Sequence, residues 1–370
     1  MDNRVLRMAS TLIHHSTALK EGEKLLIEVF DAGFELAEAL IGEAQKLGAY
    51  PFLQISPNHM QRALLMNATA EQIRQTAHFD AERMKQMDAY IAIRGASNDC
   101  ELSDVPMDKM QLFQTEYNQT VHMNIRMTDT KWCVMRYPTP AFAQKAGMST
   151  SALNDFYFSV CGLDYKGMGE RMDALVEYMD KTDNVRLVAD GTDITFSIKG
   201  YPAVKCFGRR NIPDGEVYAA PVPGSANGVI TYNVPCNYLN FVFENVSLAV
   251  KDGVIVSADG NNVERINKVL DTDEGARRFG EFAIGVNPYI TKHIVDTLFD
   301  EKMTGSLHLT PGNAYLASNN HNSSAIHWDL VQMHTPEYGG GEIWFDDVLV
   351  RKDGLFVVDE LKGLNPESYN

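Results

Sequence analysis

The first half of the chain alternates short apolar runs with longer segments whose apolar residues recur at helical spacing. The apolar runs that predict strands are 24–30 (KLLIEVF), 51–56 (PFLQIS), 89–95 (AYIAIRG) and 131–137 (KWCVMRY). The segments that predict helices are 34–47, 70–87 and 140–147. Alternation of this kind is typical of a largely parallel sheet covered by helices, because parallel neighbours need a crossover connection.

The pattern changes near residues 181–184, after which strands follow one another closely. A hairpin is expected over 185–198, and Asp252-Gly253 is a strong hairpin turn signal. Helical spacing predicts a helix over 264–284. A chain of 370 residues is long for one domain. We therefore expect an N-terminal α/β domain over 1–182 and a mixed α+β catalytic domain over 183–370.

Composition excludes several classes of protein. The net charge of −16 argues against nucleic acid and anionic membranes as partners. The five cysteines form no Cys-x-x-Cys pair, which argues against a disulfide framework or a cysteine-ligated zinc site. No run approaches the ~18 apolar residues of a membrane span, and the N-terminus lacks an apolar signal core. A cytoplasmic protein is expected.

One short motif points to chemistry: His327-Trp328-Asp329, within NSSAIHWDLV. Residues two apart point to the same side of an extended segment, so this imidazole and this carboxylate can share a metal ion. Three further candidate ligands lie upstream. Glu216 follows a turn, His308 lies in an apolar run, and Glu281 is bordered by aromatic residues. Taken singly, Glu216 is more typical of a solvated loop carboxylate and His308 of a hydrogen-bonded core residue, whereas Glu281 is equally compatible with a surface ion pair.

Together these groups exceed the four ligands that one structural zinc needs. Glu301, just upstream of His308, adds another carboxylate. The surplus predicts two metal ions bridged by a carboxylate and a water, an arrangement that activates water for hydrolysis. The phenol of Tyr315 is a candidate hydrogen-bond donor to the oxyanion.

At these residues the chain resembles the aminopeptidase T family of metallopeptidases, which includes thermophilic aminopeptidases. The resemblance lies in five blocks in the same order: NIPDGEVYAAP (211–221), LDTDEGARRFGEFAIG (270–285), DTLFDE (296–301), HLTPGNAY (308–315) and NSSAIHWDLV (322–331). The second half carries the match, while the first half is similar only in its βαβ pattern.

The resemblance implies a role for each matching residue. The implied metal ligands are Glu216, Glu281 as the bridging carboxylate, Glu301, His308, His327 and Asp329, and the implied catalytic residues are Tyr315 and Glu281. It also implies removal of N-terminal residues from peptides, a homodimer, and two divalent ions per chain, which can be zinc, cobalt, manganese or magnesium.

Three alternatives remain open at the level of sequence. His308, His327 and Asp329 can form the facial triad of a mononuclear iron oxygenase, although this leaves Glu216 and Glu281 without a role. Another binuclear metallohydrolase, such as an amidase, would use the same ligands. A non-catalytic protein that binds divalent metal or peptide is the third.

Overall fold

The computed structural model describes residues 1–239 and 241–369. Its chain forms two compact units. Unit 1 comprises Met1–Leu163 and Gly208–Pro213, and unit 2 comprises Asp164–Phe207 and the chain from 214 onward. Helix α9 (Tyr165–Lys181) therefore groups with unit 2. The domain boundary expected at 182/183 stays a prediction.

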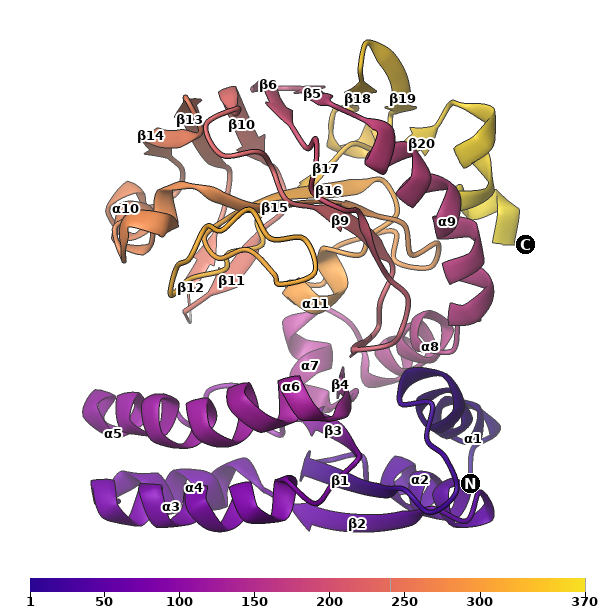
Figure 1. Ribbon diagram of the computed structural model, residues 1–370, viewed down its shortest axis with the longest axis vertical. Coiled ribbons are helices and arrows are strands. Elements are labelled where there is room, and N and C mark those ends of the chain that lie inside the picture. Colours follow the sequence, from indigo (N-terminus) through magenta and orange to yellow (C-terminus); the bar gives the residue numbers. More distant parts are fainter. Residues whose placement is uncertain (240, 370) are drawn as a thin grey trace. The chain divides into compact units, whose positions relative to one another are not determined.

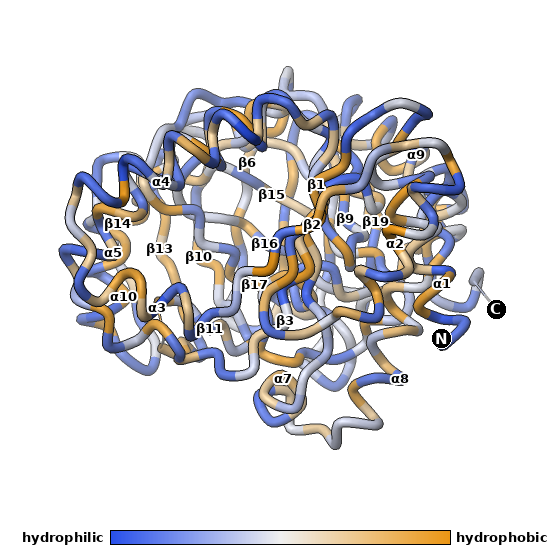
Figure 2. The backbone as a smooth tube through the Cα atoms, turned by 90° about the horizontal axis from the view of Figure 1, so that it is seen from below, coloured by the Kyte–Doolittle hydropathy of each residue, from blue (hydrophilic) through white to orange (hydrophobic). Residues whose placement is uncertain are grey.

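Unit 1 contains a five-stranded parallel sheet (Figure 1). Its strands, in spatial order, are β2 (Tyr50–Ile55), β1 (Lys24–Asp31), β3 (Ala89–Gly95), β4 (Lys131–Arg136) and β8 (Asn211–Ile212). Most of β1 is hydrophobic (Figure 2), as expected for a strand buried on both faces. The parallel sheet predicted from the alternating pattern is confirmed.

Helices precede the first of these strands and lie between the others in the sequence. They are α1 (Asn3–Ser10), η1 (Thr11–Ser16), α2 (Phe34–Lys46), α3 (Asn58–Met66), α4 (Ala70–Met84), α5 (Met107–Leu112), η2 (Phe113–Arg126), α6 (Met127–Asp129), α7 (Pro140–Lys145) and α8 (Thr150–Cys161). On one sheet face, Leu26, Tyr90 and Ala92 pack with apolar residues of α4 and η2 to form a core. Among the described residues, no helix is both long and apolar enough to cross a membrane.

Unit 2 is the mixed α+β part, and its described residues form three antiparallel sheets. The largest has the order β14 (Val254–Asp259), β13 (Val246–Lys251), β10 (Asn227–Tyr232), β6 (Thr192–Ser197), β5 (Asn184–Ala189), β18 (Glu342–Phe345), β19 (Val348–Lys352), β20 (Leu355–Phe356). The second has the order β17 (Val331–Met333), β16 (Ser306–Pro311), β15 (Phe279–Gly285), β9 (Glu216–Ala219), β7 (Val204–Cys206). The third pairs β11 (Cys236–Tyr238) with β12 (Phe241–Phe243).

The two larger sheets of unit 2 meet through their apolar side chains. Phe196 of β6 and Phe282 of β15 are both buried, and their ring centroids lie 5.0 Å apart. Besides α9, the helical segments of this unit are α10 (Val263–Leu270), η3 (Glu274–Arg277), α11 (Thr297–Asp300), η4 (Pro336–Tyr338), η5 (Asp359–Leu364) and η6 (Pro366–Tyr369). This packing fixes β15 as a central, fully buried strand.

The helix expected over 264–284 is wrong in its second half. Helix α10 ends at Leu270, the short turn η3 follows, and Phe279–Gly285 is the strand β15. All seven residues of β15 are buried. A strand buried on both faces has a continuous apolar pattern, which periodicity alone cannot distinguish from that of a buried helix. Glu281 therefore lies on a sheet and not on a helix surface.

Candidate metal centre

Three of the candidate ligands project from one face of the unit 2 sheet that has the order β17, β16, β15, β9, β7. Gly285 pairs with Glu216, and Ala283 pairs with His308. Directly paired residues lie on the same face, as do residues two apart in one strand, so Glu281 shares the face of both. The small side chains of Ala283 and Gly285 leave room between the larger groups.

Two further ligands come from the segment before β17. His327 forms an isolated bridge with Gly312, and Asp329 follows two residues later. Gly312 has φ +110°, and a Cβ there would lie 2.2 Å from the carbonyl oxygen of Ile326. Only glycine permits this close approach, which brings the His327 segment against β16.

Trp328 explains why His327 and Asp329 point together. It is fully buried, and its ring stacks on Tyr238 with centroids 5.4 Å apart and meets Phe243 edge-on at 4.9 Å. Since side chains alternate in an extended segment, anchoring Trp328 on one side turns its two neighbours to the other. The expectation that His327 and Asp329 face the same way is met, with His327 Nε2 3.1 Å from Asp329 Oδ1.

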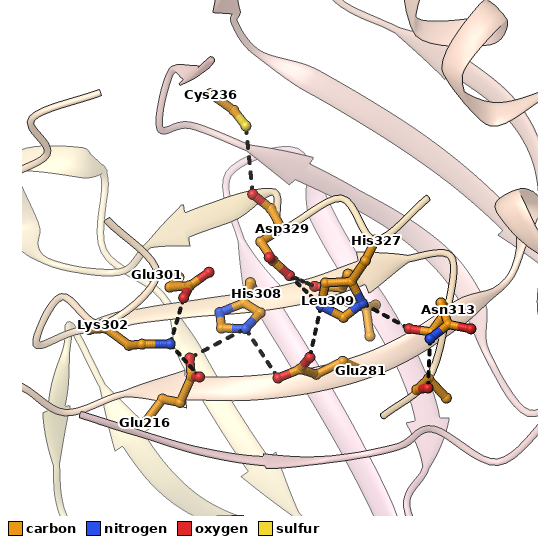
Figure 3. A network of polar contacts seen from close by, with 12 residues as sticks. Glu216, Cys236, Glu281, Glu301, Lys302, His308, Leu309, Asn313, His327 and Asp329 are labelled. Atoms are coloured by element: carbon orange, nitrogen blue, oxygen red, sulfur yellow. Dashed lines mark hydrogen bonds and ion pairs between the residues drawn. The ribbon is translucent and has the colours of Figure 1, made fainter. Parts of the chain in front are cut away.

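The ligand atoms converge closely (Figure 3). His327 Nε2 lies 3.1 Å from Glu281 Oε2, and His308 Nε2 lies 3.5 Å from Glu281 Oε1. His308 Nε2 also lies 3.6 Å from Glu216 Oε2. Glu281 thus contacts both imidazoles, one with each oxygen, which is the placement a bridging carboxylate requires.

Lys302 is the residue at this centre that the sequence reasoning did not find. Its ammonium is buried, contacts Glu216 Oε1, and lies 2.5 Å from Oε1 of Glu301 (Figure 3). Glu301 follows directly after α11. A lysine beside an acidic pair at a helix end is ordinary in sequence, so no pattern distinguished it.

Electrostatics at the two histidines reflect the surrounding carboxylates. Burial disfavours a charged His308, but its hydrogen bond to Glu281 and the charge of Glu216 outweigh burial and raise its pKa to about 9. Burial likewise opposes charge on His327, yet Asp329 raises the pKa of this imidazole well above its ordinary value. Without a metal ion, both rings therefore hold a proton where a cation would otherwise lie.

The pKa values of two buried carboxylates of the centre are shifted in opposite directions. Burial raises the pKa of Glu301 to about 8, with help from the negative charges of Asp329 and Glu216. Burial also opposes ionisation of Glu281, but its close contacts with the imidazoles of His308 and His327 lower its pKa overall. The centre contains more buried negative charge than its own cation, Lys302, offsets.

The donor set fits divalent metal. Glu216 Oε2, Glu281 Oε2 and His327 Nε2 are buried and have no hydrogen-bond partner among the described residues. His327 Nδ1 lies 2.8 Å from the carbonyl oxygen of Asn313. A proton on Nδ1 donates to that carbonyl and leaves the Nε2 lone pair directed at the carboxylates, as in many metal-ligating histidines.

The ligand atoms fall into overlapping groups, each able to hold one ion. The groups are Glu216–Glu281–His308, Glu281–His327–Asp329, Glu301–His308–Asp329 and Cys206–Asp214–Glu216, with the atoms of each within 4.8 Å of one another. Glu281 belongs to the first two. The fourth group adds Cys206, whose part the sequence did not indicate, and Asp214, which precedes Glu216 by two residues.

Tyr315 lies at the edge of the centre. Its ring centroid is 4.5 Å from that of His327 and 5.8 Å from that of Tyr218, and 43% of the residue is exposed. The surrounding protein, together with the charges of Asp329 and Glu281, raises the pKa of its phenol. The hydroxyl therefore stays protonated at neutral pH and can donate a hydrogen bond. The structure brings together all seven residues singled out from the sequence, although their roles stay predictions.

Comparison with known proteins identifies the family of this chain. A model of the thermophilic metalloprotease (M29) family matches residues 1–339. Aminopeptidase 2 of Geobacillus stearothermophilus is 29% identical over 213 residues, which is 50% of this chain and 51% of that protein. Aminopeptidase PepS of Streptococcus thermophilus is 23% identical over 353 residues, 84% of each chain. The chain thus spans about half the length of the first relative and most of the second.

Among solved structures, wild-type AmpT from Thermus thermophilus superposes with a TM-score of 0.81. The match covers 96% of this chain and 99% of AmpT at 19% identity, so it establishes the shared fold. The resemblance to the aminopeptidase T family inferred from five sequence blocks is confirmed. Since the family model covers nearly the whole length, this chain belongs to the thermophilic metalloprotease (M29) family.

Proposed function

We propose that this protein is an aminopeptidase that uses two divalent cations per chain to hydrolyse the first peptide bond of peptides. One observation carries the proposal: the two oxygens of Glu281 reach two different histidines and belong to two ligand groups. A carboxylate shared in this way is the expected bridge of a two-metal hydrolase. The named relatives are aminopeptidases, which agrees with this assignment.

The charge of the centre supports the binding of divalent cations. Glu216, Glu281, Glu301 and Asp329 contribute four negative charges when ionised, and Lys302 contributes one positive charge, which leaves a net −3 with neutral histidines. Buried charge without compensation is costly. One divalent ion would leave −1 and two would give +1, so the charge favours bound cations, and the shared position of Glu281 favours two of them.

Bound divalent cations would supply Lewis acidity, which polarises the scissile carbonyl and lowers the pKa of water. The side chains of the protein would bind the ions and stabilise the oxyanion. Glu216, Glu281, Glu301, His308, His327 and Asp329 would hold the ions, and Tyr315 would donate its hydroxyl proton in a hydrogen bond to the developing oxyanion. The negative character of the centre would favour a substrate with a free, positively charged N-terminus.

Several further features belong to the same proposal. The ions are zinc, cobalt, manganese or magnesium, the substrates are peptides with a free N-terminus, and the protein is a cytoplasmic homodimer. The mononuclear iron alternative needs only His308, His327 and Asp329. It gives no role to Glu216 and Glu281, although both lie within 3.6 Å of His308.

The test is a screen of aminoacyl-nitroanilides with chelator-treated protein reloaded with each divalent cation in turn. We expect hydrolysis to return with metal and the reloaded protein to hold two ions per chain by elemental analysis. An N-acetylated peptide should be a poor substrate compared with its free-amine counterpart. One tightly held ion at full activity would contradict the two-metal proposal, and equal rates on both peptides would contradict exopeptidase action.

A further inference from the structure

Unit 1 contains a cavity of about 570 Å³ that is separate from the metal centre. Its wall includes residues at the carboxyl ends of four parallel strands: Phe30 of β1, Ile55 of β2, Arg94 of β3 and Arg136 of β4. Every lining residue belongs to unit 1. The volume lies within the range of small-molecule sites in proteins, roughly 300–1,000 Å³.

The cavity lies where the topology of the sheet favours a ligand. From β1 the chain crosses to β2 on one side, and from β2 it returns to β3 on the other side of β1. The connections that leave β1 and β3 therefore diverge, and a crevice opens at the carboxyl ends of these strands. Glu28 and Phe30 of β1, together with Tyr90 and Arg94 of β3, line the cavity at this switch point.

The charges in the cavity leave a positive surplus. Arg94, Arg126 and Arg136 face two carboxylates, Glu28 and Asp80. Arg94 is the exposed residue in a strand that is otherwise buried, so its guanidinium is accessible from the cavity. Counted over the lining residues alone, three guanidinium groups and two carboxylates give a formal charge of +1.

The two carboxylates already have their partners. Glu28 Oε1 accepts hydrogen bonds from Gln54 at 2.9 Å and from Ser56 at 2.7 Å, while its Oε2 accepts one from Tyr90 at 2.5 Å. Arg126 lies 3.4 Å from the same Oε2. The Oδ2 of Asp80 accepts a hydrogen bond from Tyr117 at 2.6 Å.

The guanidinium of Arg126 in the cavity wall has a hydrogen-bond donor without an acceptor. The residue is only 7% exposed, and its Nε–H has no hydrogen-bond partner among the described residues. Its guanidinium lies over the ring of Tyr90, 4.5 Å from the centroid, which fixes its orientation. A buried guanidinium N–H without an acceptor is costly unless a ligand supplies one.

Part of the wall is apolar. Met60 and Leu64 of α3 are 56% and 63% exposed, and Ile55 of β2 is 52% exposed. Phe113 of η2 adds an aromatic side chain. From this combination we propose that the cavity of unit 1 binds a small amphipathic carboxylate, whose anionic group lies against Arg94 and Arg126 and whose apolar part packs on Met60 and Leu64.

A carboxylate fits better than a phosphate. Phosphate sites at this position of α/β folds use a glycine-rich turn after the first strand. Here β1 ends with Asp31, at the entry to that turn, and its carboxylate accepts hydrogen bonds from the backbone N–H groups of Asn58 and Ser97. An anion of the protein therefore already occupies that turn, whereas the planar fork of arginine matches a carboxylate.

The test uses calorimetry on the metal-loaded protein with three probes: N-acetylphenylalanine, its C-terminal amide and phenyl phosphate. The acetyl group removes the free amine that the proposed peptidase activity requires. We expect N-acetylphenylalanine to bind and the uncharged amide to bind at least tenfold more weakly, because the amide lacks the charge-assisted hydrogen bonds. Binding of phenyl phosphate but not of N-acetylphenylalanine would overturn the carboxylate assignment.

Substitutions in the cavity wall test whether N-acetylphenylalanine binds in the cavity of unit 1. Arg94→Gln and Met60→Glu, both at exposed side chains, should each weaken binding of N-acetylphenylalanine about tenfold or more. The matched control is Arg74→Gln, since Arg74 is exposed on α4, pairs with Glu71 and does not line the cavity. It should leave binding within about twofold. Equal affinity in wild type and Arg94→Gln, with unchanged thermal stability, would overturn the proposal, because binding at the metal centre does not depend on Arg94.

Discussion

Each unit of this protein buries a cluster of charged groups. The two clusters differ in how fully the chain itself supplies hydrogen-bond donors and positive charge to their buried carboxylates. In unit 1, both oxygens of Glu28 accept hydrogen bonds, and the guanidinium of Arg126 offsets its charge. In unit 2, buried oxygens of Glu216 and Glu281 have no hydrogen-bond partner among the described residues. The carboxylate of unit 1 is compensated by its own chain, whereas those of unit 2 are arranged for cations that the chain does not supply.

The difference shows how to distinguish a structural ion pair from a metal site. Burial of carboxylates is common to both, so burial alone indicates neither. What differs is whether local donors saturate the oxygens. Substitutions that remove one member of each cluster should therefore have different consequences when metal is added.

The largest effect is expected from Glu281→Ala, because it removes the carboxylate that both histidines contact. Hydrolysis of an aminoacyl-nitroanilide should fall by about a thousandfold or more, and the metal content should fall below two ions per chain. The matched control is Glu264→Ala, at an exposed position on α10. Full activity of Glu281→Ala with two bound ions would remove Glu281 from the centre.

A pair of substitutions tests the comparison directly. Lys302→Met and Arg126→Met each remove the cation from a buried carboxylate, and each should lower the free energy of unfolding of the metal-free protein by about 3–5 kcal/mol. Added zinc should restore much of this stability to Lys302→Met, because cations can occupy the centre. It should restore none to Arg126→Met beyond the gain seen in wild type. Thermal unfolding with and without zinc measures both, and equal recovery would contradict the distinction between the clusters.

Tyr315→Phe should have a smaller effect. It removes one hydrogen-bond donor to the oxyanion, which is worth about a hundredfold in kcat, while the bound metal should remain unchanged. Tyr289→Phe, at another partly exposed tyrosine of unit 2, is the control. If Tyr315→Phe turned over substrate as fast as wild type, the phenol would have no part in the reaction.

The smallest effect is a pH dependence of opposite sign in the two units. The pKa of His308 is raised to about 9, so in the metal-free protein its charged form adds stability below pH 6.5, and this gain is lost as the pH rises toward 9. Metal must displace the protons of both His308 and His327, so zinc affinity should fall at least tenfold for each unit of pH below 9. Burial, with Arg126 and Arg94, lowers the pKa of His122 in unit 1 to about 4, so unit 1 should lose stability as the pH falls from 6.5 to 4.

Calorimetry in buffers of different ionisation enthalpy measures the protons released on zinc binding, and His122→Gln is the control for unit 1. This variant should lose less stability than wild type between pH 6.5 and 4 while releasing the same number of protons with zinc. Zinc affinity that did not change between pH 7 and 8 would contradict the raised pKa of His308.

Much of this organisation could be predicted from the sequence. The alternation of apolar runs predicted the parallel sheet because each strand there is short and bounded by turns. The His327–Asp329 pair could be predicted because two residues of an extended segment share a side. The strand that carries Glu281 could not, since burial on both faces removes the alternation that marks a strand.

Other parts depend on tertiary contacts that local patterns do not encode. Lys302 reaches the centre only because its ammonium lies between Glu216, which is 86 residues away, and the adjacent Glu301. Likewise, the registers that place Gly285 opposite Glu216 and Ala283 opposite His308 are set by the pairing of three strands. Such convergence follows from topology and leaves no local signature in the chain.

The position of β8 late in the sequence has a consequence for how the sheet of unit 1 forms during synthesis. Strand β8, which pairs with Val134 and Met135 of β4, comes from Gly208–Pro213, a segment that has unit 2 residues on both sides in the sequence. A ribosome must therefore synthesise α9 and the β5–β6 hairpin before β8 is available to pair with β4 in the sheet of unit 1. Until then β4 exposes an unpaired edge, so a fragment that stops at Leu163 would be a poor independent folding unit and prone to edge-to-edge association.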